Sequence, residues 1–229
     1  GLEDKDSLIE VLLVGSRKNV VHELIKVLEL SGLSLSVVDV DGFALSNCFE
    51  FNYPELLEEP VYLLDIGGQQ SVFCVFWYKQ PVFFREMGFG GRHLTDILAK
   101  ILKVNKYEAE KIKLQGPGSI EKKTRGEIVR QFRAQLDLWL TEIKRLIGFY
   151  LTSVPGAEPG KRLFLSGGGS LLPGIREFLG HGLGLDVEYL DPWRKMEKDT
   201  HKFDIKYIEA VKAQFVVPTG LALRGLVDD

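Results

Sequence analysis

The sequence contains few of the residues from which metal sites and disulfide frameworks are built. Among 229 residues there are two cysteines, Cys48 and Cys74, and four scattered histidines. Both cysteines sit in apolar surroundings, which predicts reduced core residues of a cytosolic protein rather than a disulfide. Because no CxxC or HExxH pattern occurs, the sequence gives no sign of a zinc site.

Long apolar runs and strong charge of either sign are absent as well. No apolar stretch approaches the roughly 20 residues of a membrane-spanning helix, and no signal peptide opens the chain. The formal net charge of -3 gives no electrostatic footprint for nucleic acid. Hydrophobic residues make up 45% and charged residues 27%, a balance typical of soluble globular proteins with one large domain or two small ones.

The first part of the chain predicts a βαβ unit. After a linker-like stretch (residues 1–8), an apolar strand is expected from residue 9 to 14, and a second strand in LSLSVVDVD (33–41). Between them lies a helix ended by Gly32, with one apolar stripe formed by Val20, Val21, Leu24, Ile25 and Leu28. A short helix over GFALSNCFEF follows, and we place the boundary of this subdomain (9–58) at the NYPELLEEP break.

Beyond residue 59 the pattern changes to an antiparallel meander. VYLLDIGGQQSVFCVFWYKQPVFFREMGFGG contains three strands, and YKQP (78–81) is the hairpin turn between the second and third. Helices are then expected in RHLTDILAKIL and KYEAEKIK and over residues 120–151. A strand in KRLFLS, a helix in LLPGIREFLG, a strand in LDVEYLD and helical segments complete an α/β chain. We expect residues 59–214 to form the main domain and 215–229 a closing helix.

LLDIGGQQS is the first stretch that suggests a ligand. Asp65 ends a buried strand, and Gly67 and Gly68 turn the chain. Backbone N–H groups in such a turn form a small anion nest. An aspartate beside the nest repels phosphate, but it can hold a hydrated Mg²⁺ that bridges to phosphate. The alternative is a tight hairpin whose aspartate caps the turn.

LFLSGGGSLLPGIREFL is the second such stretch, where a strand passes into a helix through Gly167, Gly168 and Gly169. Three glycines cost chain entropy, so something must require bare backbone there. Such joints let a ligand approach the electropositive start of a helix, although they also occur as plain packing joints. The stretch is neither a P-loop nor GxGxxG. Paired with the Asp65 turn, it predicts a nucleotide–Mg²⁺ site.

These motifs, in this order, resemble the actin/Hsp70/FtsA ATPase superfamily and, within it, the PilM family of type IV pilus assembly proteins. VLLVGSRKNVVHELIKVLELSGLSLSVVDVDGFAL resembles the subdomain shared with FtsA, and LLDIGGQQS the second phosphate motif. PVFFREMGFGGRHLTDIL resembles the following hairpin and helix, LFLSGGGSLLPGIREFL the adenosine motif, and PTGLALRG the closing helix. The resemblance covers nearly the whole chain and implies an actin-like (ribonuclease H-like) ATPase fold.

The resemblance implies ATP and Mg²⁺ as ligands and assigns residues to them. Asp65 would hold Mg²⁺ through water, while Gly67, Gly68 and Ser71 would approach the phosphates.

The ribose and base are assigned to two other segments. EAEKIK resembles the segment that contacts the ribose and base, so Glu110 and Lys113 would lie near them. Gly167, Gly168 and Gly169 would pass beneath the adenosine, where side chains would clash.

One family element has no counterpart here. The family opens with a first phosphate hairpin of DxGxxxxK-like pattern, and nothing like it occurs in this sequence. We therefore expect a fold that is incomplete at its N-terminus and that binds ATP weakly or not at all. Gln69 or Gln70 could position water for hydrolysis, but solvent-facing polar residues in a turn explain them equally well. The expected activity is a weak ATPase at most.

The function that the resemblance implies is that of a cytoplasmic scaffold of the type IV pilus machinery, peripheral to the inner membrane. It would grip the cytoplasmic tail of an inner-membrane PilN-type partner, with residues 9–52 supplying part of the groove. One alternative is the cytoplasmic domain of a type II secretion L-type protein. An FtsA-like ATPase is another, although the GLVDD end carries no amphipathic membrane helix. A sugar kinase would need a catalytic aspartate for which no candidate is found.

Overall fold

The computed structural model describes residues 14–226 apart from 117, 119, 198 and 200, as two units that divide between Val38 and Asp39. The described part of the first unit contains helix α1 (Lys18–Leu30). Gly32, with φ +75°, ends this helix as predicted, because the N–H groups of Gly32 and Leu33 donate to the last free carbonyls of α1.

The strand predicted over residues 33–41 is not formed. Residues 31–40 are turn and irregular chain, and helix α2 begins at Asp41. A strand needs a neighbour to satisfy its backbone groups, and the described part of this unit supplies none. The first predicted strand (9–14) lies outside the described residues except for Val14. The apolar stripe of α1 therefore has no buried residue in the described structure.

The larger unit is built on a mixed five-stranded sheet with the order β3-β2-β1-β4-β5. Its strands are β1 (Val61–Ile66), β2 (Ser71–Trp77), β3 (Gln80–Met87), β4 (Arg162–Ser166) and β5 (Asp186–Tyr189). The first three pair antiparallel, which confirms the predicted meander, and β4 runs parallel to both β1 and β5. The carboxyl ends of β1 and β4 therefore share one edge of the sheet.

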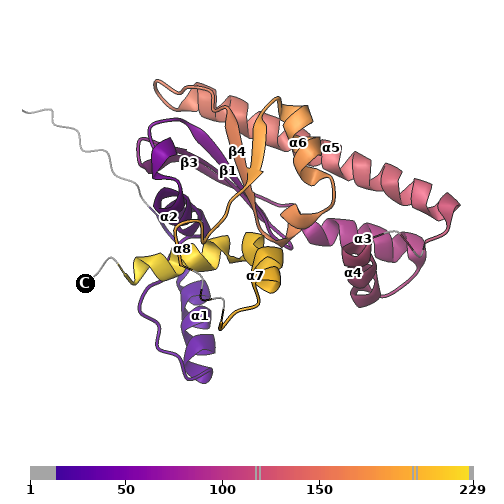
Figure 1. Ribbon diagram of the computed structural model, residues 1–229, viewed down its shortest axis with the longest axis horizontal. Coiled ribbons are helices and arrows are strands. Elements are labelled where there is room, and N and C mark those ends of the chain that lie inside the picture. The colour runs from indigo at the N-terminus through magenta and orange to yellow at the C-terminus, as the bar shows by residue number, and fades with distance from the viewer. Residues whose placement is uncertain (1–13, 117, 119, 198, 200, 227–229) are drawn as a thin grey trace, which may run out of the picture. The chain divides into compact units, whose positions relative to one another are not determined.

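Helices cover both faces of this sheet (Figure 1). Helices α5 (Lys122–Ser153) and α6 (Ile175–Leu183) pack on one face. Helices α2 (Asp41–Asn52) and α8 (Val216–Arg224) pack on the other face and against each other. The unit is therefore a three-layer α/β/α arrangement.

Strand β1 shows why two helical layers form. Its residues Tyr62, Leu64 and Ile66 belong to the core beneath α5 and α6, whereas Val61 and Leu63 belong to the core beneath α2 and α8. Successive side chains of a strand point to opposite faces, so a strand apolar on both of its faces must be covered twice.

Helices α3 (Gly91–Leu102) and α4 (Lys106–Gln115) pack on each other beside the sheet (Figure 1). Leu98, Ala109 and Ile128 join them to α5 in a small separate core. The remaining elements are helix α7 (Ile205–Val211) and the 3₁₀ turns η1 (Pro54–Leu56), η3 (Gly168–Leu171) and η4 (Lys212–Phe215).

The β2–β3 turn is strained in a way that can be tested. Tyr78 and Lys79 have φ values of 49° and 61°, the two left-handed residues of a two-residue hairpin turn. A residue with a side chain pays about 1–2 kcal/mol to adopt this left-handed backbone conformation. Glycine avoids that cost, but it loses more chain entropy on folding, which cancels part of the gain. We expect Lys79→Gly to raise the free energy of unfolding by about 0.5–1 kcal/mol in urea titrations. A decrease would show that the Lys79 side chain makes a stabilising contact.

Candidate functional site

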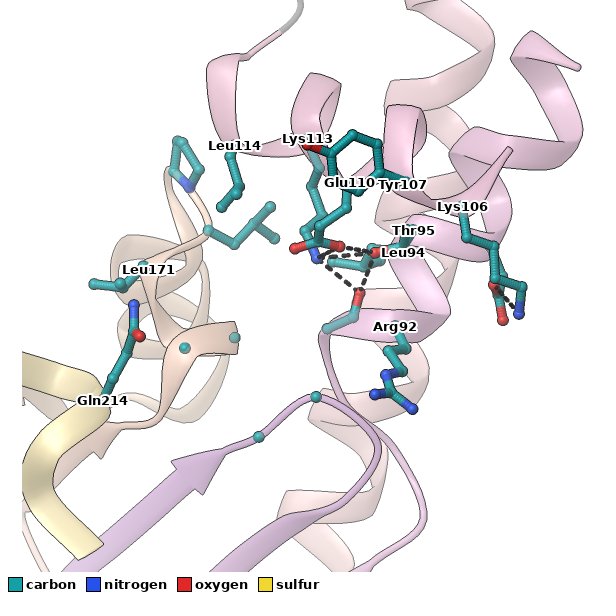
Figure 2. Close-up of a pocket in the computed structure, with 18 residues that line it drawn as sticks. Arg92, Leu94, Thr95, Lys106, Tyr107, Glu110, Lys113, Leu114, Leu171 and Gln214 are labelled. Atoms are coloured by element: carbon teal, nitrogen blue, oxygen red, sulfur yellow. Dashed lines mark hydrogen bonds and ion pairs between the residues drawn. The ribbon is translucent and has the colours of Figure 1, made fainter. Parts of the chain in front are cut away.

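A cavity of about 730 Å³ opens at the sheet edge where β1 and β4 end (Figure 2). It is formed by the turn after β1, the joint after β4 and the facing sides of α3 and α4, together with Gln214 of η4. The residues that line it are Gly67, Gly68, Gly91, Arg92, Leu94, Thr95, Asp96, Lys106, Tyr107, Glu110, Lys113, Leu114, Gly168, Gly169, Leu171, Leu172, Pro173 and Gln214.

The two glycine turns identified in the sequence meet at this edge. Ser166 at the end of β4 donates a 2.7 Å hydrogen bond to the carboxylate of Asp65, which is 101 positions away. A Cβ placed on Gly169 would lie 3.2 Å from the carbonyl oxygen of Gly67. Adjacent parallel strands end side by side, and this brings the two turns together.

The three glycines of the joint differ in how closely other atoms approach them. Gly167 has φ +81°, and a Cβ there would lie 2.4 Å from the Ile66 carbonyl oxygen. A Cβ on Gly169 would lie 2.5 Å from the Ile66 side chain. Close packing against β1 thus explains two of the three, whereas Gly168 is open and its nearest neighbour is Gln214 at 3.8 Å. Packing therefore accounts for Gly167 and Gly169, whereas the approach of a ligand at Gly168 stays a prediction.

Asp65 is not among the residues that line the cavity. Burial raises the pKa of its carboxyl, the charge of Asp41 adds to this, and the hydrogen bond from Ser166 opposes it. The described residues hold no group of three or more His, Cys, Asp or Glu side chains placed to bind a metal. The binding of hydrated Mg²⁺ by the single carboxylate of Asp65, the mode expected from the sequence, stays a prediction.

Ser71 does not reach the cavity with its side chain. It is fully buried, and its hydroxyl donates a 2.8 Å hydrogen bond to the carbonyl of Phe89. The expectation that this side chain approaches phosphates therefore conflicts with the geometry. As the first residue of β2, Ser71 instead holds the loop that leads into α3 against the sheet.

The start of α3 is bonded to the Gly67–Gly68 turn. The N–H groups of Gly91 and Arg92 donate to the carbonyls of Gly67 and Gly68 at 2.9 and 2.8 Å. These two amides are therefore not available to an anion. The N–H groups of Gly68 and Gln69, by contrast, have no acceptor among the described residues. At the cavity, the Gly68 N–H of this turn is therefore a free donor, whereas the first two amides of α3 are not.

Glu110 and Lys113 come together on α4 as predicted, but most of their bonding is internal. Lys113 Nζ donates to the Gly91 carbonyl at 3.1 Å, to Thr95 Oγ1 at 3.0 Å and to Glu110 Oε2 at 2.8 Å. Only 13% of the Lys113 side chain is exposed, so Lys113 fastens α4 to the first turn of α3.

Glu110 retains an oxygen for the cavity. Its side chain is 42% exposed, and Oε1 has no partner among the described residues. Burial raises its pKa, but the hydrogen bonds from Lys113 and Thr95 outweigh burial and leave the pKa lowered. Glu110 therefore presents an ionised acceptor to the cavity, which suits a hydroxyl donor.

The sequence interpretation missed several residues of this site. Arg92 follows the GFGG stretch directly and Thr95 comes three residues later, so a second glycine-to-helix joint was the available signal. Lys106 and Tyr107 adjoin the predicted Glu110 segment. Gln214 lies in a segment far along the chain, and no local pattern indicates that it reaches the cavity.

None of the helices in the described residues combines the length and apolar character needed to cross a bilayer.

Comparison with known proteins identifies relatives of this fold. A solved structure described as the PilM-PilN type IV pilus biogenesis complex matches with a TM-score of 0.79 and 26% identity, covering 92% of this chain and 59% of that one. The ethanolamine utilization protein EutJ from Carboxydothermus hydrogenoformans matches with a TM-score of 0.63 and 22% identity, covering 91% and 62%. MreB 5 of Spiroplasma citri bound to AMPPNP matches with a TM-score of 0.57 and 15% identity, covering 91% and 65%.

These matches confirm the predicted actin-like fold, and the chain spans about three fifths of the length of the chain it matches in the PilM-PilN complex. The sequence profile of the type IV pilus assembly protein PilM matches residues 2–226, almost the full length. The chain belongs to the PilM family of type IV pilus assembly proteins.

Proposed function

We propose that this chain acts in a cytoplasmic scaffold of the type IV pilus machinery and binds an adenine nucleotide as a conformational ligand. The observation that carries the proposal is the convergence of the Asp65 turn, the triple-glycine joint and Glu110 on one cavity of about 730 Å³. A cavity of this size falls within the range that holds a nucleotide-sized ligand.

The surface of the cavity supports a nucleotide in particular. Gly68 and Gly168 present bare backbone, and free N–H groups in the turn suit phosphate oxygens. Glu110 offers an ionised acceptor for ribose hydroxyls. Leu114, Leu171 and Pro173 supply apolar walls for a base.

Hydrolysis has less support than binding. Gln69 and Gln70, the two candidates for positioning water, are exposed and do not line the cavity. General base catalysis requires a group within hydrogen-bond reach of the reacting water. We therefore propose that nucleotide binding changes the conformation of the protein and that ATP is hydrolysed slowly or not at all.

Titration of the 229-residue chain with ADP and with Mg²⁺–ATP, followed by calorimetry, tests nucleotide binding. Saturable binding with one site per chain is expected. Absence of heat and of any rise in melting temperature at millimolar nucleotide would overturn the nucleotide part of the proposal, because a ligand of the folded state must stabilise it.

Asp65 is proposed to hold Mg²⁺ through water, and Asp65→Asn separates this role from folding. The raised pKa means that the folded state prefers the protonated form, so stability is lost as pH rises through and above the ordinary value of 3.8. The amide carries no charge and can still accept the bond from Ser166. We expect Asp65→Asn to raise the free energy of unfolding at pH 7 by about 0.5–2 kcal/mol while weakening Mg²⁺-dependent nucleotide binding.

The measurement for Asp65→Asn is urea unfolding of both proteins from pH 4 to pH 8, beside nucleotide titration with and without Mg²⁺. The stability difference between variant and parent should grow with pH. A variant that is less stable at pH 7 would contradict the view that the ionised carboxylate is unfavourable to the fold.

The proposed partner is the cytoplasmic tail of an inner-membrane PilN-type protein. The support is the match to a PilM-PilN complex over 92% of the chain, together with apolar residues of α1 that the described residues leave exposed, among them Val20, Leu24 and Val27. Titration of a synthetic PilN-type tail peptide, with and without ADP, tests this. Failure of the peptide to bind in either condition would overturn the proposed partner and leave the proposed nucleotide binding standing. The family match favours this pilus role over the type II secretion alternative.

A further inference from the structure

The charges of the cavity do not balance. Its lining contains three cations, Arg92, Lys106 and Lys113, and two carboxylates, Asp96 and Glu110. Lys106 pairs with Asp96 and Lys113 with Glu110, each at 2.8 Å. Within the described residues the guanidinium of Arg92 has no ion pair, hydrogen bond or ring contact. Arg92 is therefore the cation of the cavity lining that has no ion-pair partner in the described part of the chain, although its charge helps to lower the pKa of Glu110.

Arg92 stands beside the free donors of the first glycine turn. Its own N–H is bonded to the Gly68 carbonyl, which fixes its backbone to the turn. Its Nε lies 3.8 Å from the position that a Cβ on Gly68 would occupy. No described residue accepts from the N–H groups of Gly68 and Gln69 there. A guanidinium fork beside free amides is the donor set that phosphate oxygens accept best.

The two other charged groups on this side of the cavity, Glu110 and Lys113, are unsuited to phosphate. Leu114 and Leu171 lie on one side in Figure 2 and Arg92 on the other, with Glu110 and Lys113 between them. The ionised Glu110 repels an anion, and Lys113 is already saturated by its three acceptors. A molecule with an apolar end and an anionic end is thereby oriented with its anion at Arg92.

We propose that Arg92 is a phosphate-binding residue by which this cavity distinguishes nucleotides from nucleosides, an inference that rests on the proposed nucleotide function. Arg92 donates from its guanidinium to the phosphate oxygens nearest the Gly67–Gly68 turn. Because an arginine is always charged, this contact forms without Mg²⁺ and is independent of Asp65. The chain therefore retains selectivity for phosphate when the divalent cation is removed.

The test is calorimetric titration of the 229-residue chain with ADP and with adenosine in buffer containing EDTA. Arg92→Ala is compared with the parent, with Arg92→Lys, and with Lys100→Ala, which removes an exposed cation from the same helix outside the cavity. A lost hydrogen bond to a charged group predicts that Arg92→Ala weakens ADP binding roughly 10-fold to 100-fold. Adenosine binding should change less than about twofold, and Lys100→Ala should leave both ligands unaffected.

The lysine variant and the adenosine titration separate a phosphate contact from a structural role. Arg92→Lys should recover part of the ADP affinity, because it restores charge without the planar fork. Equal weakening of ADP and adenosine, or an unchanged ADP affinity, overturns the role of Arg92 and leaves the nucleotide function standing. If the parent chain binds neither ligand, the nucleotide function itself is wrong and the role of Arg92 falls with it.

Discussion

Gly220→Ala should destabilise the protein by about 3 kcal/mol, because the added methyl group meets backbone at a helix crossing. Helices α2 and α8 cross at this position, and a Cβ on Gly220 would lie 1.7 Å from the carbonyl oxygen of Ala44 and 2.4 Å from its carbonyl carbon. Both residues are buried, and the obstacle is backbone rather than a side chain that can rotate. The helices must separate, which opens the core that contains Val216 and Phe49.

The measurement is urea unfolding followed by circular dichroism, with Gly148→Ala as the matched control. Gly148 lies inside helix α5 and is exposed, and a Cβ added there would meet no atom within 4 Å outside its own helix backbone. There the same substitution should stabilise by about 0.5–1 kcal/mol, because alanine favours a helix interior. A cost below about 1 kcal/mol for Gly220→Ala would mean that the two helices part without disturbing their core.

Gly167→Ala should cost about 3 kcal/mol and abolish nucleotide binding, because it combines strain with a clash. Its φ of +81° and ψ of 157° lie in a region open essentially to glycine alone. A Cβ would also lie 2.4 Å from the Ile66 carbonyl oxygen and 2.9 Å from Asp65 Oδ1. Relief requires moving the joint away from β1, which also breaks the 2.7 Å bond from the Gly167 N–H to the Ala213 carbonyl.

Gly156→Ala separates the two contributions. Gly156 also has positive φ, +70°, but no atom lies within 4 Å of its added methyl group. It should therefore cost only the backbone strain of about 1–2 kcal/mol and leave ADP titration unchanged. Binding by Gly167→Ala should be measured where circular dichroism shows the chain folded. ADP affinity equal to the parent's would show that the joint can move without altering the cavity.

Much of the element order followed from local patterns. The meander, the long α5 helix and the two glycine turns were predictable because period-2 and period-3.6 patterns and turn residues act over short distances. The strand expected at residues 33–41 failed for the complementary reason. Its apolar residues are compatible with a strand, but a strand exists only with a neighbour, and sequence periodicity cannot supply one.

In the candidate site, too, some residues could be predicted from local patterns and others could not. Gly67, Gly68, Glu110, Gly168 and Gly169 were expected from motifs, and they do line the cavity.

Other details of the site depended on neighbours distant in the chain. The Ser71 hydroxyl donates a hydrogen bond to the Phe89 carbonyl, and the Lys113 ammonium donates to acceptors at the start of α3. Which polar groups remain free is decided by partners that no local pattern specifies, so Arg92 emerged only from the folded structure.

By itself, the sequence determined which segments become strands and helices around the Asp65 and triple-glycine turns, because backbone preference and side-chain periodicity are local properties. The tertiary structure alone decided that these turns meet, that Lys113 is internally bonded and that no described acid pairs with Arg92. Strand order and the packing of α3, α4 and α8 set those distances, and they arise from burial of apolar surface across the whole unit.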